Sequence, residues 1–225
     1  MTGVSTLGMT RADWLDARRT GIGGSDAAKI VLSPEQYKYA DPGALYLDKI
    51  GEGPEEEEPS LAARHGTYCE EFVAQLWEEA TGLKVRRMNI MLRSPDHPFM
   101  IADIDRKVVG RREGLECKTT GEFAARMKIK DEETGEASWI DKFVEGDMET
   151  TFSRVPQWYC QVQHYMAVTG WDMWHLGVLI GNRKFLHYDI PRDQAWIDEM
   201  VRQEEEFWAR VEARDDIWHD KTTTA

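Results

Sequence analysis

The chain has 225 residues, which suits one domain of the larger single-core size or two small ones. Hydrophobic residues make up 41% and charged residues 31%, a globular composition that excludes general disorder. Lys and Arg number 28 and Asp and Glu number 41, so the formal charge of −13 excludes a polycation that binds nucleic acid over its whole surface. Any DNA channel must therefore be a local basic strip on an acidic body.

The cysteines and the apolar runs indicate the cellular compartment. Cys69, Cys117 and Cys160 are widely spaced and form no CxxC pair, which favours a reducing compartment and excludes a four-thiolate iron–sulfur cluster. The first residues show no basic region followed by an apolar run, and no stretch approaches 18 apolar residues. We expect a soluble cytoplasmic protein without membrane contact.

The first 60 residues predict short helices. Thr10 is a plausible N-cap of a first helix, and the glycine-rich turn 20–26 leads into a second helix that Ser25 is well placed to cap. Asp41 and Pro42 begin a third helix that ends near Gly51. The acidic run 55–58 is most simply a solvated loop.

Elements of a mixed α/β core follow. Apolar residues recur at helical spacing over 60–82, and Gly82 is a good stop for this helix. Strand-like runs cover 85–92, 99–109 and 114–119, with a hairpin turn at 110–112. Residues 121–153 are expected to be a loop-rich excursion with a short helix. A helix over 156–168, strands over 174–180 and 185–190, and an amphipathic helix over 194–214 complete the chain.

This order of elements predicts a single domain. A helix, three strands, a helix and a strand form one core over about 60–190, without an internal repeat or a domain-sized linker. Helical parts over about 10–52 and 194–214 are added at its two ends.

Two acidic residues and a lysine form the most informative pattern. Glu116 and Lys118 share a strand face because alternate side chains point the same way, while Cys117 points into the core. If the neighbouring strands pair as a hairpin, the carboxylates of Asp105 and Glu116 lie side by side, where they repel each other without a cation. The two carboxylates and the Cys117 carbonyl suit Mg²⁺ or Mn²⁺, and Lys118 would orient the attacking water or hold the scissile phosphate.

The same spacing also arises by chance, because Asp and Glu are frequent here. Further residues agree with the chemistry. Glu70 lies on the preceding helix four residues after Gly66, and Gln161 and Tyr165 share one face of the helix that follows the strands.

These residues resemble the PD-(D/E)xK nuclease superfamily and, more narrowly, the YqaJ-type viral recombinase family, which includes phage lambda exonuclease. The motifs that carry the resemblance span residues 14 to 170 in the expected order. They are Trp14-x3-Arg18-x6-Ser25, Gly66-x3-Glu70, Ala102-Asp-Ile-Asp105, Leu115-Glu-Cys-Lys118 and Pro156-x2-Tyr159-x-Gln161-Val-Gln163-His-Tyr165. The implied fold is the α/β nuclease core with added N- and C-terminal helices.

The resemblance implies roles for individual residues. Asp105 and Glu116 bind the metal, Lys118 is the catalytic lysine, and Glu70 completes the metal site directly or through water, with two Mg²⁺ ions per site. Gln161, Gln163 and Tyr165 contact the site or the nearby DNA. Arg18 and Ser25 receive the 5′-phosphate, which agrees with the guanidinium's affinity for phosphate and with the dipole of a helix start. For Ser25 a helix cap, and for Arg18 a surface ion pair, are the alternatives.

The sequence departs from the family pattern at two places. Asp103 stands where a small or hydroxyl residue is expected, and it would either add a metal ligand or be solvated. The insertion at 121–153 is longer than in lambda exonuclease, so Lys128, Lys130 and Trp139 either line DNA or only shape a loop. Basic residues near the proposed site either follow a phosphate backbone or are solvated strand ends; they are Lys84, Arg86, Arg87, Arg106, Lys107, Arg111 and Arg112.

The function implied is a Mg²⁺-dependent 5′→3′ exonuclease that degrades one strand of double-stranded DNA ends to 5′-mononucleotides and leaves 3′ single-stranded tails. The resemblance further implies phage-type recombination in a bacterial host cell, a single-strand annealing recombinase as partner, and a homo-oligomer such as a ring-shaped trimer. The alternatives are an endonuclease of the same fold, of restriction or resolvase type, and a non-catalytic DNA-binding module.

Overall fold

The structure is a computed structural model that describes residues 2–54, 58–131 and 134–219, so the predicted acidic loop lies outside them except for Glu58. In chain order the elements are β1 (Thr2–Ser5), α1 (Arg11–Arg19), α2 (Gly24–Val31), α3 (Pro42–Lys49), α4 (Leu61–Thr81), β2 (Val85–Arg86), β3 (Ile90–Arg93), β4 (Ile101–Asp103), β5 (Arg106–Val108), β6 (Glu113–Thr120), β7 (Arg126–Lys130), β8 (Ala137–Asp141), α5 (Met148–Arg154), α6 (Pro156–Thr169), β9 (Met173–Ile180), β10 (Lys184–Pro191) and α7 (Gln194–Ala213). None of the described helices is long and apolar enough to cross a membrane.

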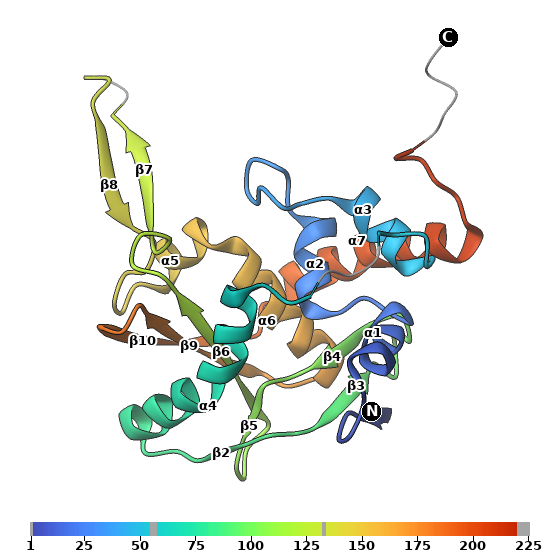
Figure 1. The fold of residues 1–225 in the computed structure, drawn as a ribbon, viewed down its shortest axis with the longest axis horizontal. Coiled ribbons are helices and arrows are strands. Elements are labelled where there is room, and N and C mark those ends of the chain that lie inside the picture. The colour runs from blue at the N-terminus through green and yellow to red at the C-terminus, as the bar shows by residue number, and fades with distance from the viewer. Residues whose placement is uncertain (1, 55–57, 132–133, 220–225) are drawn as a thin grey trace.

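A five-stranded mixed sheet in the order β10-β9-β6-β5-β2 forms the centre of the molecule (Figure 1). β5 and β6 pair as the antiparallel hairpin expected from the turn at 110–112. β6 and β9 are parallel, which requires the long crossover that contains α6. The mixed α/β fold predicted from the sequence is confirmed.

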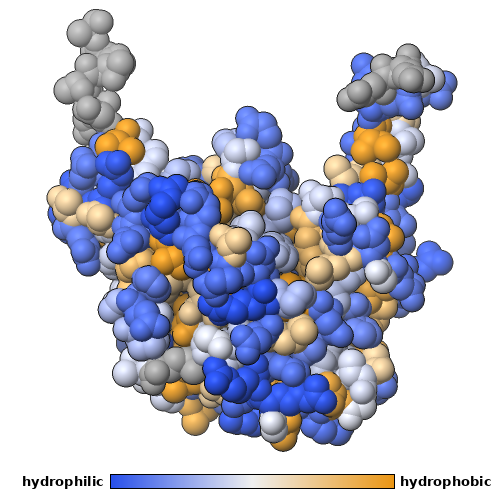
Figure 2. Space-filling view, turned by 180° about the vertical axis from the view of Figure 1, so that it is seen from behind, coloured by the Kyte–Doolittle hydropathy of each residue, from blue (hydrophilic) through white to orange (hydrophobic). Residues whose placement is uncertain are grey.

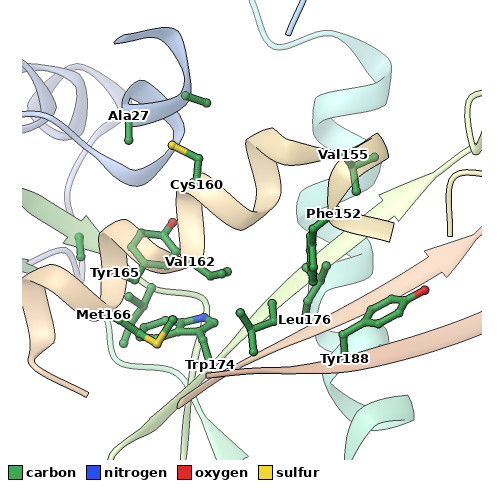
Figure 3. Close-up of a cluster of buried hydrophobic side chains, with 14 of the residues drawn as sticks. Ala27, Phe152, Val155, Cys160, Val162, Tyr165, Met166, Trp174, Leu176 and Tyr188 are labelled. Carbon is green, nitrogen blue, oxygen red and sulfur yellow. The ribbon is translucent and has the colours of Figure 1, made fainter. Parts of the chain in front are cut away.

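Helices α4 and α6 cover opposite faces of this sheet. Val73, Ala74 and Trp77 of α4 pack on Leu115 and Cys117 of β6. On the other face, side chains of α6 point toward β9 (Figure 3). The Tyr165 and Trp174 rings, from α6 and β9, lie with their centroids 5.1 Å apart. Apolar layers thus lie on both faces of the sheet and hold it in place between α4 and α6.

Two of the predicted strands are each divided in the structure. The run 85–92 forms β2 and β3, and the run 99–109 forms β4 and β5. In each run the two halves belong to different sheets. β2 and β5 lie in the five-stranded sheet, whereas β3 and β4 lie in a separate three-stranded sheet of order β1-β3-β4. The prediction of continuous strands was therefore wrong, and Asp105 lies where the chain passes from one sheet to the other.

The segment 121–153 contains more regular structure than predicted. β7 and β8 form an antiparallel two-stranded arm that projects from the body before the short helix α5 (Figure 1). The sequence of β7 alternates polar with apolar residues, a strand signal that the loop prediction missed, and most side chains of the arm are exposed.

The N-terminal helices pack against α7 through a small apolar cluster that includes Ile22, Leu45, Tyr46, Phe207 and Val211. Thr10 caps α1 as predicted, in a reciprocal pair with Asp13. The prediction that Ser25 caps α2 was wrong, because Gly23 is the N-cap and Ser25 is the second residue of the helix.

Only the second half of α4 is buried against the sheet. Leu61, Tyr68 and Phe72 recur at helical spacing, but their side chains are exposed. Val73, Ala74 and Trp77 alone are buried in this helix. The first half of α4 instead brings Gly66, Thr67 and Glu70 to the edge of the hairpin.

Candidate active site

The site is built at the junction that precedes β5. Arg106 pairs with Leu115 across the hairpin, so continuing this antiparallel register places Asp105 opposite Glu116. The Oδ2 atom of Asp105 accepts a hydrogen bond of 2.8 Å from the backbone N–H of Cys117. Residues opposite each other in antiparallel strands point to the same face. The two carboxylates therefore lie together, as the sequence predicted.

Glu116 is buried and held by two donors. Its Oε1 atom accepts hydrogen bonds from Lys118 Nζ at 2.6 Å and from Gln161 Nε2 at 2.7 Å. Gln161 also donates to the Tyr165 hydroxyl at 2.7 Å, which fixes its amide. One carboxylate oxygen of Glu116 is thus fixed, while the other is buried without a hydrogen-bond partner.

Burial and neighbouring negative charge raise the pKa of three carboxylates at the site. Burial and the nearby Asp105 raise the pKa of Glu116 to about 8 and that of Glu70 to about 7. Burial also raises the pKa of Asp105. For Lys118, burial would lower the pKa, but Glu116 and Asp105 hold it above its usual value. The three carboxylates therefore carry more negative charge than the single ammonium group of Lys118 can neutralise.

These residues fit a divalent cation. A hard cation would give the partnerless Oε2 of Glu116 a ligand contact and would lower the raised pKa values of the carboxylates. Oxygen donors are also the ligands that Mg²⁺ prefers. Within the described residues, no group of three or more His, Cys, Asp or Glu side chains is arranged to hold a metal ion. The reason is local: Glu116 is turned to Lys118, and Glu70 lies 3.8 Å from the Arg106 guanidinium.

Two cavities meet at these carboxylates. One of about 280 Å³ is lined by Gly66, Glu70, Asp105, Glu116 and Lys118. Another of about 430 Å³ shares Glu70 and Asp105 and extends to Arg11, Trp14, Arg18 and Ser25 of the N-terminal helices. A ligand that fills the larger cavity therefore reaches from Arg18 and Ser25 to Glu70 and Asp105.

Arg18 is oriented by a buried ion-pair network. Its guanidinium donates to Ser25 Oγ at 3.1 Å and to Asp26 Oδ1 at 3.0 Å, and it lies over the Trp14 ring. The other oxygen of Asp26 accepts from Lys49 Nζ at 2.8 Å, and both side chains are buried. The start of α2 thus presents the Ser25 hydroxyl and a helix dipole at the cavity, and Arg18 adds a guanidinium from the end of α1.

A glycine allows α2 to approach α6 at this place. A Cβ atom on Gly24 would lie 2.6 Å from Cε1 of Tyr165 and 3.0 Å from Cγ of Gln161. The close approach brings the N-terminal end of α2 against the residues that hold Glu116.

Not every predicted residue faces the site. Gln163 is fully buried, and its amide is bonded to the Pro191 carbonyl and the Asp193 N–H, so the expected contact with DNA is contradicted. Residues i and i+2 of an α-helix point about 200° apart around its axis, so Gln161 and Gln163 lie on different sides of α6. Arg106 is also buried and donates to Glu71 and to the Asp105 carbonyl, so it does not follow a phosphate backbone as an exposed strand end would.

Asp103 is half-buried at the end of β4, lines the larger cavity, and is not one of the carboxylates on the hairpin. Its Oδ2 atom accepts a hydrogen bond of 2.7 Å from the Trp14 indole. Sequence reasoning missed this contact and the Asp26–Lys49 pair. The Trp14 contact had a local signal, because Arg11, Trp14 and Arg18 are spaced to lie on one face of a helix. The Asp26–Lys49 pair joins residues 23 positions apart and leaves no such signal.

The fold is shared with solved structures of phage-type exonucleases. The alkaline exonuclease LHK-Exo from Laribacter hongkongensis superimposes with a TM-score of 0.61 at 18% identity, covering 90% of this chain and 93% of that chain. A phage-related exonuclease from Haemophilus somnus 129PT gives a TM-score of 0.60 at 14% identity, covering 89% and 99%. At these identities the likeness shows a shared fold.

The family model of the YqaJ-like viral recombinase domain matches residues 13–172, and the chain belongs to this family. Uncharacterized protein YqaJ from Bacillus subtilis strain 168 is 39% identical over 203 residues. The match covers 89% of this chain but 56% of that relative, so the chain spans little more than half the length of the curated relative it matches. The family resemblance inferred from the motifs is confirmed.

Proposed function

We propose that this protein is a Mg²⁺-dependent deoxyribonuclease that degrades one strand of double-stranded DNA from its 5′ end. It would release 5′-mononucleotides and leave a 3′ single-stranded tail. The observation that carries the proposal is the buried Glu116, bonded to Lys118 and placed opposite Asp105 on the same hairpin. Membership of the viral recombinase family and the exonuclease fold support the same activity.

The chain's own residues divide the work at the scissile phosphate. A divalent cation, Mg²⁺ or Mn²⁺, held by Asp105, Glu116, the Cys117 carbonyl and Glu70, would polarise the phosphodiester and acidify a bound water. Lys118, held in its charged form, would orient that water or bind the phosphate. Gln161 fixes one oxygen of Glu116, which would leave the other, partnerless oxygen to hold the cation. Two ions per site is the number that the family resemblance implies.

Digestion of linear and closed circular DNA tests this function. With Mg²⁺ we expect release of 5′-mononucleotides from the linear duplex, no cutting of the closed circle, and no activity after chelation of the metal. Rapid cutting of the circle would favour the endonuclease. Binding without hydrolysis of either DNA would favour a non-catalytic module.

The end of the larger cavity that is lined by Arg18 and Ser25 is proposed to receive the 5′-phosphate. Arg18 and Ser25 lie beside each other at the start of α2, where a guanidinium and a helix dipole favour an anion. A 5′-phosphate bound there would set which end of the strand enters and how far it reaches toward the carboxylates.

Arg18→Ala should abolish the preference for 5′-phosphorylated ends. A charge-assisted hydrogen bond contributes about 1.5–3 kcal/mol, so we expect roughly a 10- to 150-fold loss of rate on 5′-phosphorylated duplex and little change on 5′-hydroxyl duplex. Arg19→Ala is the matched control, because Arg19 pairs with Asp16 and Asp48 instead. A variant that keeps the full preference would contradict the assignment of this pocket.

The biological setting is proposed from the family. A YqaJ-like viral recombinase domain would act in phage-type recombination inside a bacterial cell, with a single-strand annealing protein that takes over the 3′ tail. A homo-oligomer such as a ring-shaped trimer would keep the enzyme on its DNA. Size measurement in solution checks the assembly.

A further inference from the structure

The β7–β8 arm is not accounted for by the site described above. It projects from the body beyond the end of β6 (Figure 1), and within the described residues its two strands pair with no other strand. Hydrophobic surface is visible on the arm below its tip (Figure 2). A lone two-stranded hairpin gains little stability in water, and an exposed one is suited to contact another molecule.

One face of the arm combines cations with aromatic rings. Trp139 of β8 lies directly opposite Lys128 of β7, and Arg126 and Lys130 lie on the same face by alternation. The Phe123 ring, just before β7, lies with its centroid 4.9 Å from that of Trp139. Phe123 is 75% and Trp139 43% exposed. We call these five residues the aromatic–basic face.

This face is close to the site along the chain. Lys118 and Phe123 are five residues apart, so their Cα atoms are separated by at most about 18 Å. A strand of B-DNA advances about 3.4 Å per nucleotide, so the Cα atom of Phe123 lies within the length of about five nucleotides of the Cα atom of Lys118. At the base of the arm, Arg126 lines a cavity of about 370 Å³ together with Arg183, Lys184, Glu122 and Asp141. The three cations there pair with carboxylates, so the exposed cations Lys128 and Lys130 of the arm carry the argument.

We propose that the aromatic–basic face binds single-stranded DNA near the active site, with bases stacked on Phe123 and Trp139 and phosphates beside Lys128 and Lys130. The inference deepens the proposed nuclease function and rests on it. Exposed rings interleaved with cations suit unpaired bases, whose faces are available for stacking. The acidic residues Asp131 and Glu136 lie beyond the last strand pair, toward the tip. Asp141 lies opposite Arg126 on this face and pairs with it at 3.5 Å, so the phosphates are assigned to Lys128 and Lys130.

Binding of a labelled single-stranded oligonucleotide to full-length protein tests the proposal. A Glu116→Gln background prevents cleavage while anisotropy is measured in Mg²⁺. We expect Phe123→Ala and Trp139→Leu each to weaken binding roughly 5- to 100-fold, and Trp139→Tyr to restore most of it. Lys128→Gln should lower the slope of log affinity against log salt by about 0.7.

Ile129→Ala is the matched control, since Ile129 is exposed on the opposite face of the same strand and its substitution should leave DNA affinity unchanged. Unchanged affinity in Trp139→Leu would overturn the inference, as would a change in the mass of the assembly with no change in DNA affinity. In the latter case the arm is a protein interface. Nucleotide release by the unsubstituted protein is measured separately, so failure of the nuclease function is distinguished from failure of the DNA-binding face.

Discussion

Replacing Glu116 with glutamine should lower Mg²⁺-dependent nucleotide release by about 10³-fold or more. The substitution keeps the size of the side chain and its hydrogen bond with Gln161, but it removes the charge that would hold the cation opposite Asp105. Loss of one group that stabilises developing charge typically costs 10²–10³ in rate, and loss of a group on which the whole site depends costs more. The measurement is the initial rate of nucleotide release from linear duplex.

The control for this variant is Glu113→Gln. Glu113 lies on the same strand, but its carboxylate pairs with His175 outside the two cavities. We expect it to retain nearly full activity. The assignment of the site is wrong if Glu116→Gln, folded and of normal thermal stability, still degrades DNA at a rate close to that of the parent protein.

Asp26→Ala should destabilise the protein by about 3–5 kcal/mol. The Asp26 side chain is buried and pairs with Arg18 and the buried Lys49, and it also accepts from the Gly23 N–H at the start of α2. Removing it leaves a buried ammonium group without its partner, which is the costly way to break a buried ion pair. Urea unfolding should show a lower midpoint with an unchanged m-value.

Asp48→Ala is the matched control for this variant. Asp48 lies next to Lys49, but its carboxylate is 48% exposed and pairs with Arg19, so we expect a loss below about 1 kcal/mol. Equal losses for the two variants would show that the network around Lys49 does not stabilise the fold.

The effect of Asp26 should also depend on pH. Burial alone would raise its pKa, but Arg18 and Lys49 hold the pKa well below its usual value. A depressed folded-state pKa contributes stability that is complete above the unfolded value of about 3.9 and is lost as the pH falls below it. The difference in stability between the parent protein and Asp26→Ala should therefore narrow below about pH 4, measured by unfolding at several pH values.

Secondary structure was most predictable where local rules decide it. Helix α6 begins at Pro156 and ends before Gly170, whose φ of 65° ends the helix. The spacing of Glu116 and Lys118 places them on one strand face by alternation alone, and their Nζ–Oε1 distance of 2.6 Å follows from it. Regular periods and end signals are properties of a few consecutive residues, so they are readable without the fold.

Partners far apart in the chain were not predictable in the same way. The choice between Gln161 and Gln163 depends on which side of α6 meets the hairpin, and both lie in a helix that is buried on most sides. The exposure of Leu61, Tyr68 and Phe72 depends on how far α4 extends past the sheet. Neither the orientation of α6 nor the extent of α4 past the sheet is encoded in a short window of residues.

Family membership, the order of the core elements and the grouping of Asp105 with Glu116 and Lys118 are readable from the chain, because they depend on motif order and strand alternation. Three features emerge only in the folded molecule: Asp105 lies between two sheets, Asp26 and Lys49 hold Arg18, and an arm carries Phe123 and Trp139 into solvent. Packing between distant segments sets which side chains meet and which remain exposed, and no short window of residues records that packing.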